Sequence, residues 1–180
     1  FYNSSVRTND EYTEDAVITF ENCSFIGSLD KDLAPIEVYD NTGKNLTVVI
    51  KNCTFTQTKR GINVVGASTK DGKTIVEIDG CTFNGTTRDK FAALQIAEST
   101  ATVKFTNNTV NALGNAPAIV RYHETFFTQS NGTKDNLTNF TFSGNTVSTN
   151  IPESKYVDLD QHKDDEFYNE ALKLFKAGLK

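Results

Sequence analysis

The chain has 180 residues, which is enough for one domain with a sizeable core, and 37% of them are hydrophobic and 23% are charged. This composition excludes a disordered chain, and a net charge of −5 without a strongly basic run excludes nucleic acid as an expected partner. No apolar stretch approaches the roughly 20 residues that cross a bilayer, so no membrane insertion is expected.

The N-terminal segment, residues 1–15, carries no complete copy of the repeat that follows it. We expect it to supply a partial first coil. The chain begins with Phe1 in place of Met, which is typical of a processed or excised piece and leaves room for a removed leader.

Five segments of eight residues share the pattern apolar-x-apolar-x-(Asn/Gly)-(Cys/Asn)-(Ser/Thr)-(Phe/Val), and they begin 30, 28, 27 and 37 residues apart. A repeat of this period indicates a solenoid, in which stacked units share one core. The segments are Ile18–Phe25, Val48–Phe55, Val76–Phe83, Val103–Val110 and Phe140–Val147.

Each position of the segment predicts a structural role. The first and third positions are always apolar, which is typical of a strand with one buried face. The fifth holds only Asn or Gly, residues that tolerate positive φ, so we expect a left-handed turn there. Stacking would place the sixth-position residues in a line of buried thiols and hydrogen-bonded amides. No metal is expected there, since three thiols are too few for a tetrahedral site. They are Cys23, Cys53, Cys81, Asn108 and Asn145.

A second strand, with alternate residues pointing outward, is expected in each winding. Equivalent residues of neighbouring windings would stand about 4.8 Å apart. Opposite charges then fall beside each other, as at Glu77 and Lys104, which favours in-register pairing. The expected second strands are Ile36–Val38, Ile62–Val64, Leu94–Ile96, Ala118–Val120 and Val157–Leu159.

Over about residues 15–160 the repeats resemble those of the pectate-lyase-like right-handed parallel β-helix superfamily. The resemblance implies an all-β chain wound as a single-stranded right-handed parallel β-helix of about five coils. Many members hold a polysaccharide beside an outward sheet face. The resemblance implies no particular chemistry, because this fold serves many functions. The catalytic motifs of pectate lyases, polygalacturonases and pectin methylesterases are missing from the sequence.

The outward residues of the second strands are the first candidates for glycan binding. Amide, carboxylate and guanidinium groups make paired hydrogen bonds with sugar hydroxyls. The alternative is an ordinary solvated sheet face. The expected outward columns are Glu37, Asn63, Gln95, Ile119 and Asp158, and then Tyr39, Val65, Ala97, Arg121 and Asp160. The expected sugar contacts are Glu37, Tyr39, Asn63, Gln95 and Arg121.

Asp158 and Asp160 share one face of a strand. They would either hold Ca²⁺ together with a third oxygen ligand or form a solvated acidic strand end. The second alternative is the more ordinary one, and no metal site is assigned.

The longest insertion, residues 122–136, adds the remaining candidates, because long loops on rigid scaffolds often carry function. Phe126 and Phe127 would stack on a sugar or cover a groove, or else pin the loop to the barrel. His123 beside Glu124 is a weak acid–base signal. All four are ligand-binding candidates, and no residue is assigned as catalytic.

Residues 164–179 predict an amphipathic helix with acidic residues in its first turn and lysines late, as the helix dipole favours. The open end of a solenoid needs a cover. We therefore assign residues 1–163 to the β-helix and 164–180 to a C-terminal capping helix, with a linker helix as the alternative. The apolar face consists of Phe167, Ala171, Leu174 and Phe175.

The leading functional hypothesis is a non-catalytic, secreted or cell-surface module that binds polysaccharide or cell-surface glycan, or acts in adhesion or structure, without a cofactor. The second is a polysaccharide lyase or glycoside hydrolase acting on acidic polysaccharide, with Arg121, His123 and Glu124 aided by Glu37 or Gln95. A third is a coil segment of a larger surface or phage-fibre protein. The expected location is extracellular or on the cell surface, and no oligomeric state is predicted.

Overall fold

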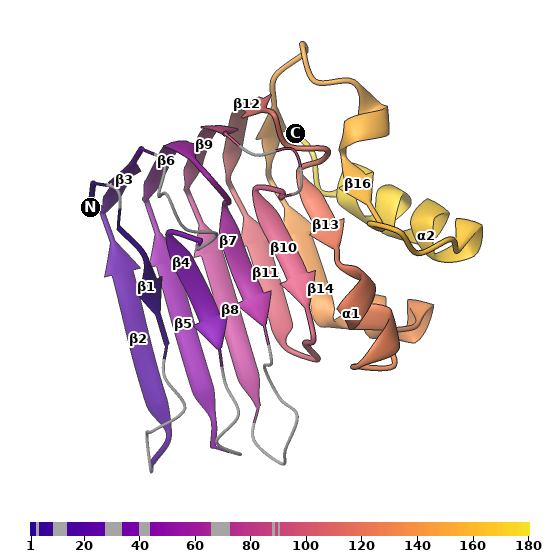
Figure 1. The fold of residues 1–180 in the computed structure, drawn as a ribbon, viewed down its shortest axis with the longest axis horizontal. Coiled ribbons are helices and arrows are strands. Elements are labelled where there is room, and N and C mark those ends of the chain that lie inside the picture. Colours follow the sequence, from indigo (N-terminus) through magenta and orange to yellow (C-terminus); the bar gives the residue numbers. More distant parts are fainter. Residues whose placement is uncertain are drawn as a thin grey trace.

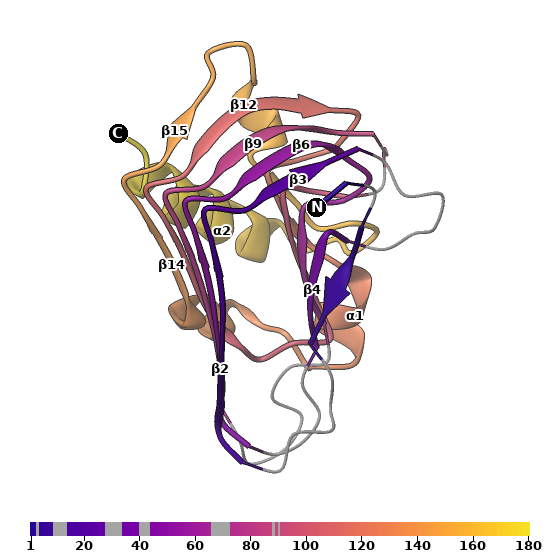
Figure 2. The ribbon, with the colours of Figure 1, turned by 90° about the vertical axis from the view of Figure 1, so that its left-hand side faces the viewer.

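The fold is that of a computed structural model, which describes residues 1–2, 4–8, 14–27, 34–39, 44–65, 73–87, 89 and 91–180. The described strands form three parallel sheets around a common core (Figures 1 and 2). Successive strands enter different sheets, and each strand pairs with its equivalent one winding later. The chain is therefore an all-β parallel solenoid.

Each sheet collects one kind of strand. The six-stranded sheet contains β1 (Val6–Arg7), β4 (Ile36–Tyr39), β7 (Ile62–Val65), β10 (Leu94–Ala97), β13 (Val120–Tyr122) and β16 (Val157–Asp158). The β2 sheet contains β2 (Ala16–Glu21), β5 (Leu46–Lys51), β8 (Thr74–Asp79), β11 (Thr102–Thr106) and β14 (Phe140–Ser143). The β3 sheet contains β3 (Ser24–Ile26), β6 (Thr54–Thr58), β9 (Thr82–Thr86), β12 (Thr109–Gly114) and β15 (Thr146–Val147).

The prediction of two strands per winding is wrong, because a winding contributes a strand to each of three sheets. The eight-residue repeat bends in its middle and so belongs to two sheets. The bend is the predicted left-handed turn, which is confirmed in all five copies. The φ values are 55° at Asn22, 52° at Asn52, 64° at Gly80, 54° at Asn107 and 64° at Gly144.

The predicted register of the repeat is confirmed. Ile18 lies opposite Val48, and Val48 opposite Val76. The outward neighbours follow the same register, with Nζ of Lys104 2.7 Å from Oε1 of Glu77. Stacking of like apolar residues and pairing of unlike charges thus select the same alignment.

The predicted line of cysteines and asparagines is also confirmed. Backbone N–H groups donate to the side chain one winding later, from Cys53 to Sγ of Cys81 (3.4 Å) and from Cys81 to Oδ1 of Asn108 (2.8 Å). The same side chains donate to carbonyl oxygens, Cys81 to Ile50 (3.4 Å) and Asn108 to Ile78 (3.0 Å). The thiol therefore makes the same two contacts as the amide. The side-chain hydrogen bond with the Cys53 thiol and burial raise the pKa of the Cys81 thiol, and all three cysteines are free.

Gly61 lies where two windings approach too closely for a side chain. A Cβ atom at this position would meet the backbone oxygen of Ala93 at 1.9 Å. We expect Gly61→Ala to lower the free energy of unfolding by about 3 kcal/mol, since a backbone atom yields less easily than a side chain. Urea denaturation measures this, with the exposed Thr141→Ala as a control expected within about 0.5 kcal/mol of the parent. Equal stability of the two variants would contradict the prediction.

The predicted C-terminal helix is α2 (Asp165–Ala177), which covers one end of the solenoid (Figure 1). Its N-cap is Asp164, whose Oδ1 accepts from the backbone N–H of Phe167 at 2.9 Å. Phe167 and Phe175 are buried, and the ring of Phe175 packs against Phe142 of β14.

The insertion after β13 is helical in part, whereas a loop was predicted. It holds α1 (Glu124–Thr128) and leads into the 3₁₀ segment η1 (Lys134–Asn139), and a second 3₁₀ segment, η2 (Glu153–Lys155), precedes β16. In the described ranges, no helix has both the length and the apolar character needed to cross a membrane. Of the expected partial first coil, residues 3 and 9–13 lie outside the described residues, and Val6–Arg7 forms β1 beside β4.

Candidate functional site

A row of polar side chains crosses the outer face of the six-stranded sheet, with one residue from each strand. The flanking residues of β4, Ile36 and Val38, are fully buried in the core, so the residue between them points away from it. The six residues lie in register, each opposite the next, and we call them the polar row. They are Arg7, Glu37, Asn63, Gln95, Arg121 and Asp158.

Arg121 belongs to this row, which corrects the predicted column. The sequence predicted a strand at residues 118–120 with Ile119 facing outward, but Ile119 is fully buried and the strand is β13. Tyr122 selects this register, because its ring fills the core against Phe126 and Phe140, with centroids 5.4 and 5.3 Å away. Arg121 therefore lies beside Gln95 instead of beside Ala97.

The middle of the polar row is buried although it points away from the core. The exposed fractions are 8% for Glu37, 2% for Asn63, 4% for Gln95 and 8% for Arg121. The amide nitrogen Nδ2 of Asn63 donates to Oε1 of Glu37 at 3.1 Å, and Nε of Arg7 lies 3.6 Å from Oε2 of the same carboxylate. At this end of the row, the carboxylate of Glu37 is thus paired with its two neighbours in the row.

Two amide oxygens in the row, Oδ1 of Asn63 and Oε1 of Gln95, are buried and have no hydrogen-bond partner within the described ranges. They come from adjacent strands and lie in register. A buried acceptor without a donor costs about 1–3 kcal/mol. A ligand that brings hydrogen-bond donors to these oxygens therefore gains more than it would at a solvated site.

Arg121 connects the row to two carboxylates. Its Nε lies 3.1 Å from Oδ2 of Asp158, and its Nη2 donates to Oδ1 of Asp160. Nε2 of His123 lies 3.4 Å from Oδ2 of Asp160. The carboxylates of this acidic pair hold a guanidinium group, a contact that neither predicted alternative included. Among the described residues no group of three or more His, Cys, Asp or Glu side chains is placed to hold a metal ion.

Asp158 also lines a cavity of about 470 Å³ at the end of the row, which we call the Asp158 cavity. Burial raises the pKa of the Asp158 carboxyl above its ordinary value, while the charge of Arg121 acts in the opposite direction. A shifted carboxyl in a cavity is typical of functional sites. The cavity is lined by Ser154, Val157, Asp158, Leu159, Asp160, His162, Lys163, Asp164, Asp165 and Tyr168.

The predicted aromatic residues of the insertion pin it to the rest of the molecule. Phe126 is 1% and Phe127 is 9% exposed, and both rings contact Phe167 of α2. The ring of His162 stacks on Phe127 with centroids 3.8 Å apart. They are therefore not placed to stack on a sugar, and the second alternative given for these residues is confirmed.

The remaining candidates surround the row. His123 is the N-cap of α1, where its Nδ1 accepts from the backbone N–H of Thr125 at 3.3 Å. Glu124 follows in the first turn, and its backbone N–H donates to Oδ2 of Asp160 at 3.4 Å. Tyr39 lies in the adjacent row, with the Arg7 guanidinium 4.2 Å from its ring centroid.

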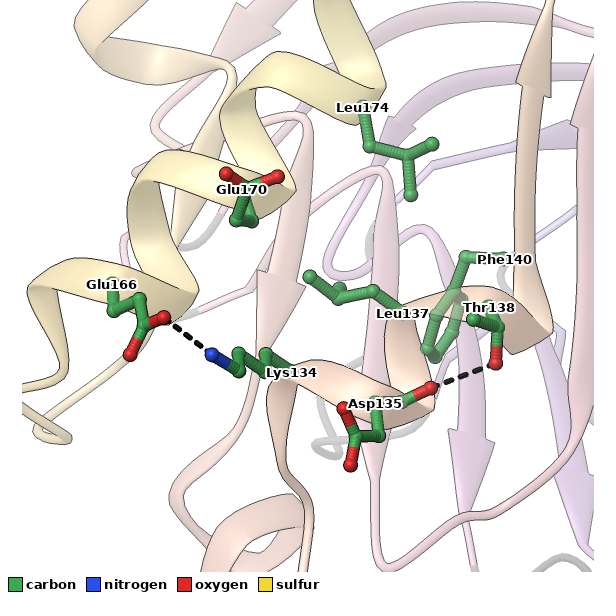
Figure 3. Close-up of a pocket in the computed structure, with 8 residues that line it drawn as sticks. All are labelled: Lys134, Asp135, Leu137, Thr138, Phe140, Glu166, Glu170 and Leu174. Carbon is green, nitrogen blue, oxygen red and sulfur yellow. Dashed lines mark hydrogen bonds and ion pairs between the residues drawn. The ribbon is translucent and has the colours of Figure 1, made fainter.

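A second cavity, of about 440 Å³, lies between η1 and α2 (Figure 3). Leu137, Phe140 and Leu174 give it an apolar lining, and Nζ of Lys134 bonds to Oε1 of Glu166 at 2.5 Å beside it. None of the predicted site residues lines it. The sequence signals this cavity only through the amphipathic pattern of α2. This pattern does not show where η1 packs against the helix.

The structure thus gathers part of the predicted site. Glu37, Asn63, Gln95 and Arg121 share the polar row, and Arg7 and Asp158 complete it. No protein-family model, no curated protein sequence and no solved structure matches this chain significantly. A functional proposal therefore depends on the solenoid, the row and the Asp158 cavity.

Proposed function

We propose that this chain is a non-catalytic, secreted or cell-surface β-helix module that binds glycan, and that it is right-handed and pectate-lyase-like. The parallel solenoid supports the fold, and right-handed connections between parallel strands are the rule. One observation carries the glycan part: the amide oxygens of Asn63 and Gln95 lie in register without a donor in the described chain. Sugar hydroxyls are donors that suit such oxygens.

A glycan chain on this face meets polar groups at regular intervals. Neighbouring members of the row are separated by the strand spacing of about 4.8 Å. The row ends at Asp158, whose cavity adds further carboxylates and the ring of Tyr168. Because Asn63 and Gln95 are almost fully buried, binding has to uncover them first. We therefore expect association slower than that of an open, rigid site.

Arg121 and His123 already have protein partners, and this supports a binding role over a catalytic one. Arg121 is held by two carboxylates, and His123 caps a helix. Burial raises the pKa of Asp158, and this direction of shift is the observation that favours the alternative, a polysaccharide lyase or hydrolase with a carboxyl as general acid.

Gln95→Leu tests the binding role. A glycan array probed with the full chain identifies the ligand, and titration of that ligand measures affinity. The variant is expected to bind roughly 2- to 12-fold more weakly, which corresponds to one lost hydrogen bond. It should unfold at the same or a higher temperature, since an unpaired buried oxygen has been removed.

The control is Thr141→Val, an exposed position on the β2 sheet, which should bind like the parent chain. Unchanged affinity in Gln95→Leu would place the glycan elsewhere, and an array without any bound glycan would remove the proposal. Incubation with uronic-acid polymers, with and without Ca²⁺, distinguishes glycan binding from the alternative, a polysaccharide lyase or hydrolase. Unsaturated products that absorb ultraviolet light, or new reducing ends, would establish catalysis instead.

A further inference from the structure

Among the described residues, no helix covers the N-terminal end of the solenoid, whereas α2 covers the other end (Figures 1 and 2). The inward residue Ile18 of β2 is only half-buried, whereas its equivalent Val48 in the next winding is fully buried. The large hydrophobic residues that are exposed in the described chain all lie at this end. They are Phe1 (55%), Tyr2 (73%), Val17 (72%) and Ile26 (44%).

Two of the three sheets already hold an additional parallel strand or bridge at this end. Tyr2 forms a parallel bridge with Ile26 of β3, and β1 pairs with β4. The ring of Phe1 stacks on Phe25 at 4.8 Å, much as Phe25 stacks on Phe55 at 5.1 Å. In the third sheet β2 is the last strand, with no strand on its outer edge among the described residues.

The free edge of β2 presents backbone groups in a defined pattern. The N–H groups of Ala16 and Asn22 donate towards β5, at 2.9 and 3.0 Å. In a parallel sheet, alternate residues direct their backbone groups to opposite sides. Val17, Thr19 and Glu21 therefore direct theirs to the free edge. Such an edge is a template for another strand.

We propose that the free edge of β2 binds one extended peptide strand in parallel orientation, with apolar residues at alternate positions. The orientation follows from the two neighbouring edges, which have both received parallel partners. The alternation follows from the inward residues Ile18 and Phe20, which such a strand would cover. The partner thus has the chemistry of the repeat itself, as in the Leu46–Lys51 strand.

A labelled peptide with the sequence of residues 45–52 is the probe, and the full chain is the receptor. Saturable binding is expected for the parent chain, with at least a tenfold loss for Thr19→Pro. Proline removes one N–H from the free edge and leaves the hydrogen bonds to β5 in place. The matched variant Thr19→Ala keeps this N–H and should bind like the parent. Thermal unfolding of both variants confirms that they fold.

Three kinds of result would overturn this proposal. The first is equal binding by Thr19→Pro and Thr19→Ala, and the second is equal binding of a scrambled peptide or no saturable binding at all. The third is a stable dimer that Thr19→Pro separates, which would assign the edge to a second copy of the chain.

Discussion

Asn108→Ala is expected to lower the free energy of unfolding by about 2–4 kcal/mol. The side chain is fully buried, accepts from the backbone of Cys81 at 2.8 Å and donates to the carbonyl of Ile78 at 3.0 Å. Alanine leaves the N–H of Cys81 buried without its acceptor, at about 1–3 kcal/mol. It also removes the side-chain donor from the carbonyl of Ile78, which the pairing of β8 with β11 still satisfies, at about 0.5–1.5 kcal/mol. Urea denaturation monitored by circular dichroism measures the loss.

The matched variant Asn108→Cys should cost much less, because the previous winding already uses a thiol at this position. Sγ of Cys81 accepts from Cys53 and donates to Ile50, both at 3.4 Å. A thiol at position 108 therefore retains weaker forms of both hydrogen bonds. If the two variants were equally destabilised, the hydrogen bonds of this column would not be the source of its stability.

Arg121→Leu is expected to lower the free energy of unfolding by about 3–5 kcal/mol at neutral pH. Only 9% of the arginine side chain is exposed, and its removal leaves the carboxylates of Asp158 and Asp160 uncompensated. The exposed pair of Lys104 and Glu77 is the control, because Lys104→Leu should cost no more than about 1 kcal/mol.

The loss in Arg121→Leu should shrink as the pH falls. Burial raises the pKa of Asp158 in the folded chain, and removal of the arginine charge raises this pKa further. A carboxyl with a raised folded pKa binds its proton more tightly in the folded state than in the unfolded state, so acidification favours folding in this range. Denaturation at about pH 7 and about pH 4 measures this difference. A loss independent of pH would show that lost packing, and not uncompensated charge, is responsible.

The sequence by itself determined the repeating unit and its register. Alternation of apolar residues is a local property of a strand, and every copy of the repeat imposes the same alignment. The left-handed turns at Asn22 and its equivalents followed from the backbone preference of Asn and Gly. The line of Cys53, Cys81 and Asn108 followed from stacking alone.

The composition of the candidate site was decided by tertiary packing. Ala118, Ile119 and Val120 are all apolar, so their pattern does not define which residues of this winding face outward. The insertion decides it, because Tyr122 packs against Phe126 and thereby moves Arg121 into the row with Gln95. Burial of the polar row, the pairing of Arg121 with two carboxylates, and the cavity between η1 and α2 likewise depend on segments distant in sequence. A local pattern specifies which residues alternate, but only contacts between such distant segments determine which side chains meet.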